Sequence, residues 1–377
     1  MKPVYLDCNA TTPLEPEVLE IIHHYLSEEY GNSGSRTHLY GHTASKAVET
    51  ARGEIAKLLT CANDEIIFTS GATESDNLAV LGLARHGLEQ NKTHIISTKI
   101  EHKAVLEPLE KLQTQGFEIT LVDCDQTGRV LPEDIESELR DNTLLVSVMH
   151  ANNETGVIQP LEKIADLLQQ HPAYLHTDAA QGFGKDIEVL KHPGIDLISI
   201  SGHKIYGPKG IGALAVKRSN NKKIPLDPLM VGGGQERGLR PGTLPVHLIA
   251  GLGAAARLAK RDKEQREQTN LTFRKELLQQ LGALGPTLHG DQNHCLANTI
   301  NLSFGDLDSE AIMLGLKDVV AISNGSACTS TTYQPSHVLT AMGLTEDEAE
   351  TATRWSWCHM SDTPDWEQVR NLIQQLI

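Results

Sequence analysis

The sequence predicts an α/β fold, with a mostly parallel seven-stranded sheet flanked by helices and a smaller α+β domain beside it. Up to residue 216, short β-branched and apolar runs alternate with longer amphipathic runs, which is typical of strand–helix–strand units with parallel strands. After Thr243 this alternation gives way to a long stretch rich in Ala, Leu and charged residues. The length of 377 residues suits two domains, or one large domain with an appendage, and it can bury a sizeable core.

The expected elements follow from hydrophobic periodicity, taken in chain order. Two helices precede the first strand, at Glu15–Glu29 and Thr43–Leu59. Short apolar runs predict the strands Glu65–Thr69, His94–Thr98, Glu118–Val122, Leu144–His150, Ala173–Thr177, Leu197–Ser201 and Gly212–Val216. Amphipathic runs between them predict helices that include Thr73–His86, Ala104–Gln115 and Leu161–Gln170.

The remainder of the chain predicts a second, smaller unit. Leu244–Leu281 is expected to form one or two helices that lead out of the sheet, and a further strand is expected at Thr299–Leu302. No linker rich in Gly, Pro and Ser separates the two parts. We therefore expect a large domain over residues 15–255 and a closely packed small domain formed by residues 1–14 and 256–377.

Charge and hydropathy exclude several classes of protein. Lys and Arg number 33 against 49 Asp and Glu, which gives a formal charge of −16 and argues against direct binding to DNA or RNA. The apolar stretches are far shorter than the roughly 18 to 20 residues that a membrane helix needs. No basic-then-apolar leader follows Met1. We expect a cytoplasmic protein without a membrane span.

The cysteines and histidines predict no structural metal site. Six cysteines, at 8, 61, 124, 295, 328 and 358, are scattered without a C-x-x-C pair, so we expect most of them to be reduced and structurally passive. His38 and His42 stand at helical spacing but lack a third ligand nearby. We interpret them as surface or helix-start residues.

Three polar segments at strand ends predict one cofactor site. Lys204, in the run 199–210, is a lysine that a neighbouring cation could push toward the neutral form, so that it condenses with an aldehyde. Asp178, in 176–181, could hold a pyridinium nitrogen of pyridoxal phosphate (PLP), and Ser70–Ser75 opens a helix that could bind its phosphate. Taken singly, a surface lysine, a helix-capping Asp and an ordinary capping box are the simpler interpretations. Their order in the chain favours a single site.

These segments resemble the cysteine desulfurases of the class V aminotransferase group, which are PLP enzymes of fold type I. The resemblance covers essentially the whole chain. The matching segments are Tyr5-Leu6-Asp7, Ala10-Thr11-Thr12, 70–77, 101–103, 152–156, 176–181, His203-Lys204, 240–243, 324–330 and Arg354-Trp355-Ser356.

The resemblance implies a role for each matching residue. Lys204 would attach the cofactor and then move the Cα proton, His102 would lie over the ring as an acid or base, and Asp178 would pair with the ring nitrogen. Arg354 would bind the substrate carboxylate, because a guanidinium makes two-point contacts. Gln181 would contact the ring hydroxyl, and the phosphate would be held by Ala72, Thr73, Ser201 and His203. Thr243 would reach the phosphate of the neighbouring subunit, which implies a homodimer with shared sites. Asn153 and Asn32 would lie near the substrate carboxylate and the ring edge.

Cys328 would be the nucleophile that accepts sulfur from L-cysteine and leaves L-alanine. Its Ser-, Gly-, Ala- and Thr-rich surroundings resemble the desulfurases with a long cysteine loop, and the persulfide would pass to an acceptor protein. Among these, Gly31–His38 resembles the desulfurases of DNA phosphorothioation systems. Cys358, where the family usually has Gly, is either a second thiol near the site or, as we favour, a filler.

Alternatives stay open at this stage. The chain could supply sulfur for iron–sulfur clusters or tRNA thiolation. It could also be a selenocysteine lyase or class V aminotransferase that leaves Cys328 idle, or a non-catalytic scaffold.

Overall fold

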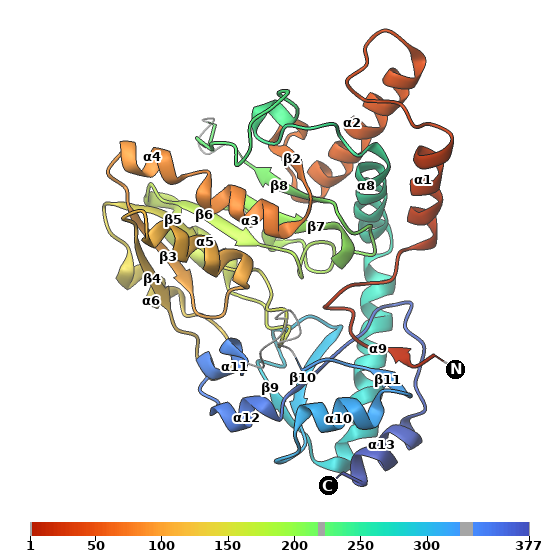
Figure 1. Ribbon diagram of the computed structural model, residues 1–377. Coiled ribbons are helices and arrows are strands. Elements are labelled where there is room, and N and C mark those ends of the chain that lie inside the picture. Colours follow the sequence, from red (N-terminus) through yellow and green to blue (C-terminus); the bar gives the residue numbers. More distant parts are fainter. Residues whose placement is uncertain (1, 218–222, 325–334, 377) are drawn as a thin grey trace.

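The computed structural model describes residues 2–217, 223–324 and 335–376. Its main sheet has seven strands in the order β2-β8-β7-β6-β5-β3-β4 (Figure 1). All neighbours pair in parallel except β8, which runs antiparallel to both β2 and β7. The strands are β2 Ile66–Thr69, β3 His94–Thr98, β4 Glu118–Val122, β5 Thr143–Ser147, β6 Tyr174–Asp178, β7 Leu197–Ser201 and β8 Gly212–Val216.

Helices cover both faces of this sheet, so its central strands are apolar on both sides. One face packs against α3 and α5, and the opposite face packs against α1, α2, α7 and α8. The alternation of side chains along β2 shows this division. Ile67 packs in the core between the sheet and helices α3 and α5, whereas Ile66 and Phe68 pack in the core on the opposite face. The helices are α1 Pro16–Ser27, α2 Leu39–Leu59, α3 Ala72–Leu81, α4 Ala84–Glu89, α5 Lys103–Gln113, α6 Pro132–Glu138, α7 Leu161–Leu167 and α8 Val246–Arg261.

A smaller layer lies below the main sheet in Figure 1, reached through the long helix α9 (Lys263–Leu281). It contains an antiparallel sheet in the order β12-β10-β9 and a parallel pair β1-β11. Trp355, Trp357 and Phe273 centre a separate hydrophobic core there. The elements are β1 Val4–Tyr5, β9 Thr287–His289, β10 Thr299–Ser303, α10 Ser309–Leu316, β11 Val320–Ala321, α11 His337–Ala341, α12 Glu346–Glu350, β12 Thr353–Ser356 and α13 Trp366–Gln374.

The predicted elements are largely observed, with differences that have local causes. The single helix expected at Thr73–His86 is two helices, α3 and α4. At the junction, a Cβ on Gly82 would lie 2.3 Å from the Leu78 carbonyl oxygen, so the chain turns where only glycine fits. Helix α2 begins earlier than expected, because the Nδ1 atom of His38 caps it by accepting from the Gly41 amide.

The stretch Leu244–Leu281, expected to form one or two helices, forms two, α8 and α9, with Asp262 between them. The domain boundaries at residues 14/15 and 255/256 stay a prediction. Within the described residues, no cluster of His, Cys, Asp and Glu is arranged to hold a metal ion. No helix among them has the length and apolar character needed to span a membrane.

Candidate active site

A cavity of about 510 Å³ lies at the carboxyl ends of β6 and β7 and the amino end of α3. Strands β5, β6 and β7 run parallel, so their carboxyl ends meet at one edge, where ligands bind in open α/β sheets. Most residues predicted for the site line this cavity: Ala72, Thr73, His102, Asn153, Asp178, Gln181, Ser201, His203, Lys204 and Arg354.

Lys204 ends a short helical turn that follows β7 and projects its amine into the cavity wall. Its ammonium group donates hydrogen bonds to the backbone carbonyl oxygens of Asn9 and Ala10, the latter at 3.0 Å. Two carbonyl acceptors hold the Nζ atom in a fixed place without adding a negative charge beside it. The amine is therefore positioned by a segment that lies almost two hundred residues away in the sequence.

The neighbouring His203 is an uncharged hydrogen-bonding group. Its Nδ1 atom lies 3.1 Å from the hydroxyl oxygen of Thr11. Burial first, and then the charges of Lys204 and Lys209, lower the pKa of His203 to about 4. The imidazole is thus neutral at neutral pH and offers one N–H donor to an anion.

Asp178, the last residue of β6, is a buried acid whose Oδ1 atom accepts from the Ala180 amide at 2.8 Å. Burial, and then the charge of Asp76, raise its pKa to about 6, while burial raises the pKa of Asp76 to about 7. The Nε2 atom of His176 lies 3.5 Å from Asp76, but burial lowers the pKa of His176 to about 4, so this ring carries no charge at neutral pH. The site therefore favours a cation placed beside Asp178.

The beginning of α3 forms the part of the cavity suited to an anion. The first amides of a helix lack intrahelical acceptors, and this helix has ten residues. A Cβ on Gly71 would meet no atom within 4 Å, so the space before these amides is open. The acid in this first turn, Glu74, accepts from Arg240 Nε at 2.9 Å, which offsets its charge. Together with the hydroxyl groups of Thr73 and Ser201, which line the same cavity, these helix amides provide donors that suit a phosphate group.

His102 caps α5, and its Nδ1 atom accepts from the Ala104 amide at 3.1 Å. The neutral ring must then carry its proton on Nε2, so that atom is the one able to donate. Glu101 before it is fully buried, and its Oε1 atom accepts from the Thr98 hydroxyl at 2.9 Å and the Met149 amide at 2.8 Å. Burial raises the pKa of Glu101 to about 8.

Arg354 lies in β12 and closes the cavity from the smaller layer, with 1% of its surface exposed. Its Nη2 atom is 2.6 Å from Asp7 Oδ1, and its Nη1 atom donates to the Asn153 carbonyl oxygen at 3.1 Å. Asn9 also donates to that carbonyl, at 3.1 Å, and accepts from Gln181 Nε2 at 2.9 Å. The guanidinium is thereby held in a fixed plane.

Two predicted residues do not line this cavity, and a third cannot be placed because it lies outside the described residues. Asn32 is exposed, and its side chain accepts from the Gly34 amide at 2.8 Å. Thr243 is exposed and away from the cavity lining, so its predicted contact with a neighbouring subunit stays a prediction. Cys328 lies outside the described residues.

Four residues that the sequence analysis gave no role support the site from behind. Asp7 and Asn9 hold Arg354 and the Asn153 carbonyl, while Asp76 and Glu101 are buried acids with raised pKa values. Asp7 stood in a segment that carried the resemblance, and Asp76 follows Thr73 by one helical turn, so a signal existed for both. The residues around Asn9 in the sequence give no signal that its backbone carbonyl group would accept these hydrogen bonds.

Comparison with known proteins identifies the family. The family model described as aminotransferase class-V matches residues 4–369. The chain belongs to the aminotransferase class-V family. Cysteine desulfurase IscS of Vibrio vulnificus (strain CMCP6) is 44% identical over 384 residues, which cover 99% of this chain and 93% of that protein. The chain therefore also belongs to the cysteine desulfurases, which are PLP-dependent enzymes.

Solved structures agree with this class-V assignment. DndA from Streptomyces lividans has a TM-score of 0.83 and 47% identity, and the match covers 94% of this chain and 98% of that one. SspA in complex with cysteine has a TM-score of 0.82 and 38% identity, with coverage of 94% and 98%. The resemblance and the fold type I architecture predicted from the sequence are confirmed.

The residues of the cavity fit PLP, the cofactor of this family. Asp178, with its raised pKa, would pair with the ring nitrogen, and Lys204 has an amine for the aldehyde. The open amides at the start of α3 and the neutral His203 would hold the phosphate. PLP bound here would supply an electron sink for bonds at the substrate Cα.

Proposed function

We propose that this enzyme converts L-cysteine to L-alanine and keeps the sulfur as a persulfide on Cys328, which passes it to an acceptor protein. The observation that carries the proposal is one cavity that combines the Lys204 amine, the Asp178 carboxylate and the Arg354 guanidinium. Lys204 suits the aldehyde of PLP, Asp178 suits its ring nitrogen, and Arg354 suits the carboxylate of an amino-acid substrate. The solved structure of SspA in complex with cysteine supports cysteine as the substrate.

Binding and proton transfer follow from the arrangement of the chain's own groups. Arg354, fixed by Asp7, would bind the substrate carboxylate and orient the Cα–H bond. Lys204 would remove the Cα proton, since its amine lies in the same cavity. The Nε2–H of His102 would donate a proton or hydrogen bond at the substrate thiol, because its Nδ1 is already occupied by the Ala104 amide.

Sulfur transfer would then use the thiolate of Cys328. Its sulfur forms a bond to the substrate Sγ while the Cβ–Sγ bond breaks, and the electron pair left on Cβ is protonated to give alanine. One cysteine and one enzyme thiol thus yield one alanine and one persulfide, with no external oxidant or reductant.

The pathway that receives the sulfur is proposed to be DNA phosphorothioation, by way of an acceptor protein. The segment Gly31–His38 and the 47% identity to DndA support this pathway. A formal charge of −16 favours delivery through a protein over direct contact with DNA. The similarity to IscS supports a general sulfur donor as the second candidate.

We also propose a homodimer with shared sites. Thr243 is exposed and does not line the cavity of its own chain, as expected for a residue that reaches the phosphate of a second subunit.

The test uses ³⁵S-labelled L-cysteine and the PLP-loaded protein. The wild type should form alanine and carry label that dithiothreitol releases, whereas Cys328→Ser should lose both and still show a cysteine-induced change in cofactor absorbance. Cys61→Ser is the matched control and should keep label and alanine, because Cys61 does not line the cavity. Label retained by Cys328→Ser would assign the sulfur to another thiol. Alanine without labelled protein in the wild type would favour a lyase that leaves Cys328 idle.

A further inference from the structure

Two cysteines from distant parts of the chain meet beside the active site. Cys8 follows the Asp7–Ser356 bridge, and its amide donates to the Ser356 carbonyl oxygen at 2.9 Å. Cys358 lies two residues beyond β12. The exposed fractions are 0% for Cys8 and 2% for Cys358, and both side chains pack with Tyr206 in one small buried cluster. The two thiols are therefore close neighbours in the fold.

This thiol pair forms the floor of its own cavity, which has a volume of about 400 Å³. Tyr5, Thr12 and Met360 are among the other residues that line it, and none of the described residues lines both this cavity and the active-site cavity. The thiol pair therefore borders a cavity that is separate from that of the substrate.

The surroundings of the pair make Cys358 the more acidic of the two thiols. Interaction with the Cys8 thiol lowers the pKa of Cys358 despite burial, and the Ser361 hydroxyl at 3.6 Å and the charge of Lys185 act in the same direction. The same contact raises the pKa of Cys8. A thiolate with a neighbouring protonated thiol is the arrangement of a reactive cysteine with a resolving partner.

Other described cysteines lack this arrangement. Burial raises the pKa of Cys61 to about 12 and that of Cys124 to about 11, and it also raises the pKa of Cys295. These thiols are expected to stay protonated and unreactive under the same conditions.

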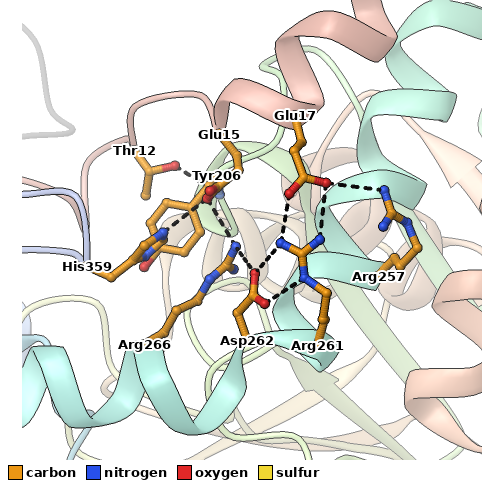
Figure 2. A network of polar contacts seen from close by, with 9 residues as sticks. All are labelled: Thr12, Glu15, Glu17, Tyr206, Arg257, Arg261, Asp262, Arg266 and His359. Atoms are coloured by element: carbon orange, nitrogen blue, oxygen red, sulfur yellow. Dashed lines mark hydrogen bonds and ion pairs between the residues drawn. The ribbon is translucent and has the colours of Figure 1, made fainter.

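His359, which follows Cys358 in the chain, and Tyr206 belong to a network of polar contacts (Figure 2). His359 Nε2 lies 3.1 Å from Glu15 Oε2, which also accepts from Arg266 Nη2 at 3.0 Å. The ring of Tyr206 packs on the two cysteines and stands edge-on to the His359 ring, with centroids 4.6 Å apart. The Arg266 guanidinium lies 5.1 Å from the centre of the Tyr206 ring. Cys358 is thus held in place by the residue that follows it and by Tyr206.

We propose that Cys358 and Cys8 form a peroxide-reactive thiol pair that closes to an intramolecular disulfide. The Cys358 thiolate attacks one oxygen of hydrogen peroxide, the O–O bond breaks, and after proton uptake the products are a sulfenic acid and water. The Cys8 thiol then attacks the sulfenic sulfur, its proton leaves with the hydroxyl group as a second water, and the S–S bond forms. Two thiols and one peroxide give one disulfide and two waters.

The new bond would lie next to residues that hold the active site. Cys8 stands between Asp7, the partner of Arg354, and Asn9, an acceptor of the Lys204 ammonium. Oxidation would therefore link the segment that anchors both side chains to the segment that follows β12. The proposal does not depend on the sulfur-transfer reaction.

The test is peptide mapping of the full-length protein after hydrogen peroxide, in a Cys328→Ser background that removes the competing nucleophile. Thiols are blocked with N-ethylmaleimide after unfolding, and the protein is digested without reductant. We expect a peptide that joins Cys8 to Cys358, lighter by two hydrogens than the two thiol peptides together, and reversed by dithiothreitol. Cys61 and Cys124 serve as internal controls and should carry N-ethylmaleimide before and after oxidation.

Two variants separate the two steps. Cys8→Ser should accumulate a sulfenic acid at Cys358, trapped by dimedone, whereas Cys358→Ser should leave Cys8 as a thiol. If either of these variants fails to fold, the peptide map of the Cys328→Ser protein, which keeps both Cys8 and Cys358, still tests the proposal by itself. Recovery of Cys8 and Cys358 as blocked thiols after peroxide, or a disulfide from either of them to a different cysteine, would overturn it.

Discussion

Replacing Arg354 with lysine isolates the part of substrate binding that depends on the carboxylate. The guanidinium makes two contacts in the structure, to Asp7 Oδ1 at 2.6 Å and to the Asn153 carbonyl oxygen at 3.1 Å. A lysine keeps the charge, but its single ammonium cannot span Asp7, Asn153 and a substrate carboxylate in one plane. The variant should therefore lose at least one charge-assisted hydrogen bond to cysteine.

The size of this loss follows from the bond that disappears. A hydrogen bond to a charged group contributes about 1.5 to 3 kcal/mol, and about 1.4 kcal/mol corresponds to a tenfold change. We expect kcat/KM for L-cysteine to fall by roughly 10- to 150-fold. Cysteamine has the thiol and the amine but no carboxylate, so its turnover should change little. The preference of the enzyme for cysteine over cysteamine should shrink by the same factor.

The assay is sulfide release from both substrates, with cofactor absorbance as a check that PLP is bound at wild-type level. Arg129→Lys is the matched control, because its contact to Asp291 at 3.6 Å lies outside the active-site cavity. It should behave as the wild type does. Equal losses for cysteine and cysteamine in Arg354→Lys would refute carboxylate binding and indicate a structural role.

Two further predictions concern buried groups of the same site. Lys204→Ala should abolish alanine formation and the absorbance of covalently bound PLP, because the amine that lies in the cavity is removed; alanine formed at the wild-type rate would contradict the assignment. Glu101, with its pKa raised from 4.5 to about 8, should stay protonated in the folded state and ionise in the unfolded state, so its contribution to stability falls as pH rises from about 4.5 to about 8. Glu101→Gln should remove that decline. The urea midpoint of the variant should therefore drop less than that of the wild type between about pH 5 and about pH 8. An identical pH dependence in both proteins would refute the burial argument.

The parts of the fold that the sequence predicted are those set by local pattern. Strands β3, β4, β7 and β8 have the predicted limits. Strands β3, β7 and β8 are buried along almost their whole length, whereas the edge strand β4 is mostly exposed or half-buried, so its run of β-branched and apolar residues alone marked it. The start of α2 was missed because its cap is a histidine, His38, and not one of the usual capping residues. The break at Gly82 was missed because the atoms that require a glycine come partly from Asp227, far along the chain.

The same division between local and distant information holds in the candidate site. Lys204, Asp178 and Thr73 stand at or shortly after the ends of strands, so strand order brings them to one edge of the sheet. Contacts that fix Lys204 and Arg354 come from the short segment Asp7–Ala10, which follows β1, the strand that pairs in parallel with β11.

Periodicity along a chain reports which face of an element is buried, but it carries no signal for a carbonyl oxygen that accepts a bond from another domain. Asn9 and Ala10 act on Lys204 through such carbonyl groups, and their side chains could differ without changing that bond. Cys8 lies in the same segment and packs in one cluster with Cys358. The sequence marked Cys358 only as a departure from the family and gave Cys8 no role, so the pair itself was not predicted. Candidate site side chains can therefore be predicted from motifs at strand ends, whereas the backbone segment that orients them is found only once the two ends of the chain are placed together.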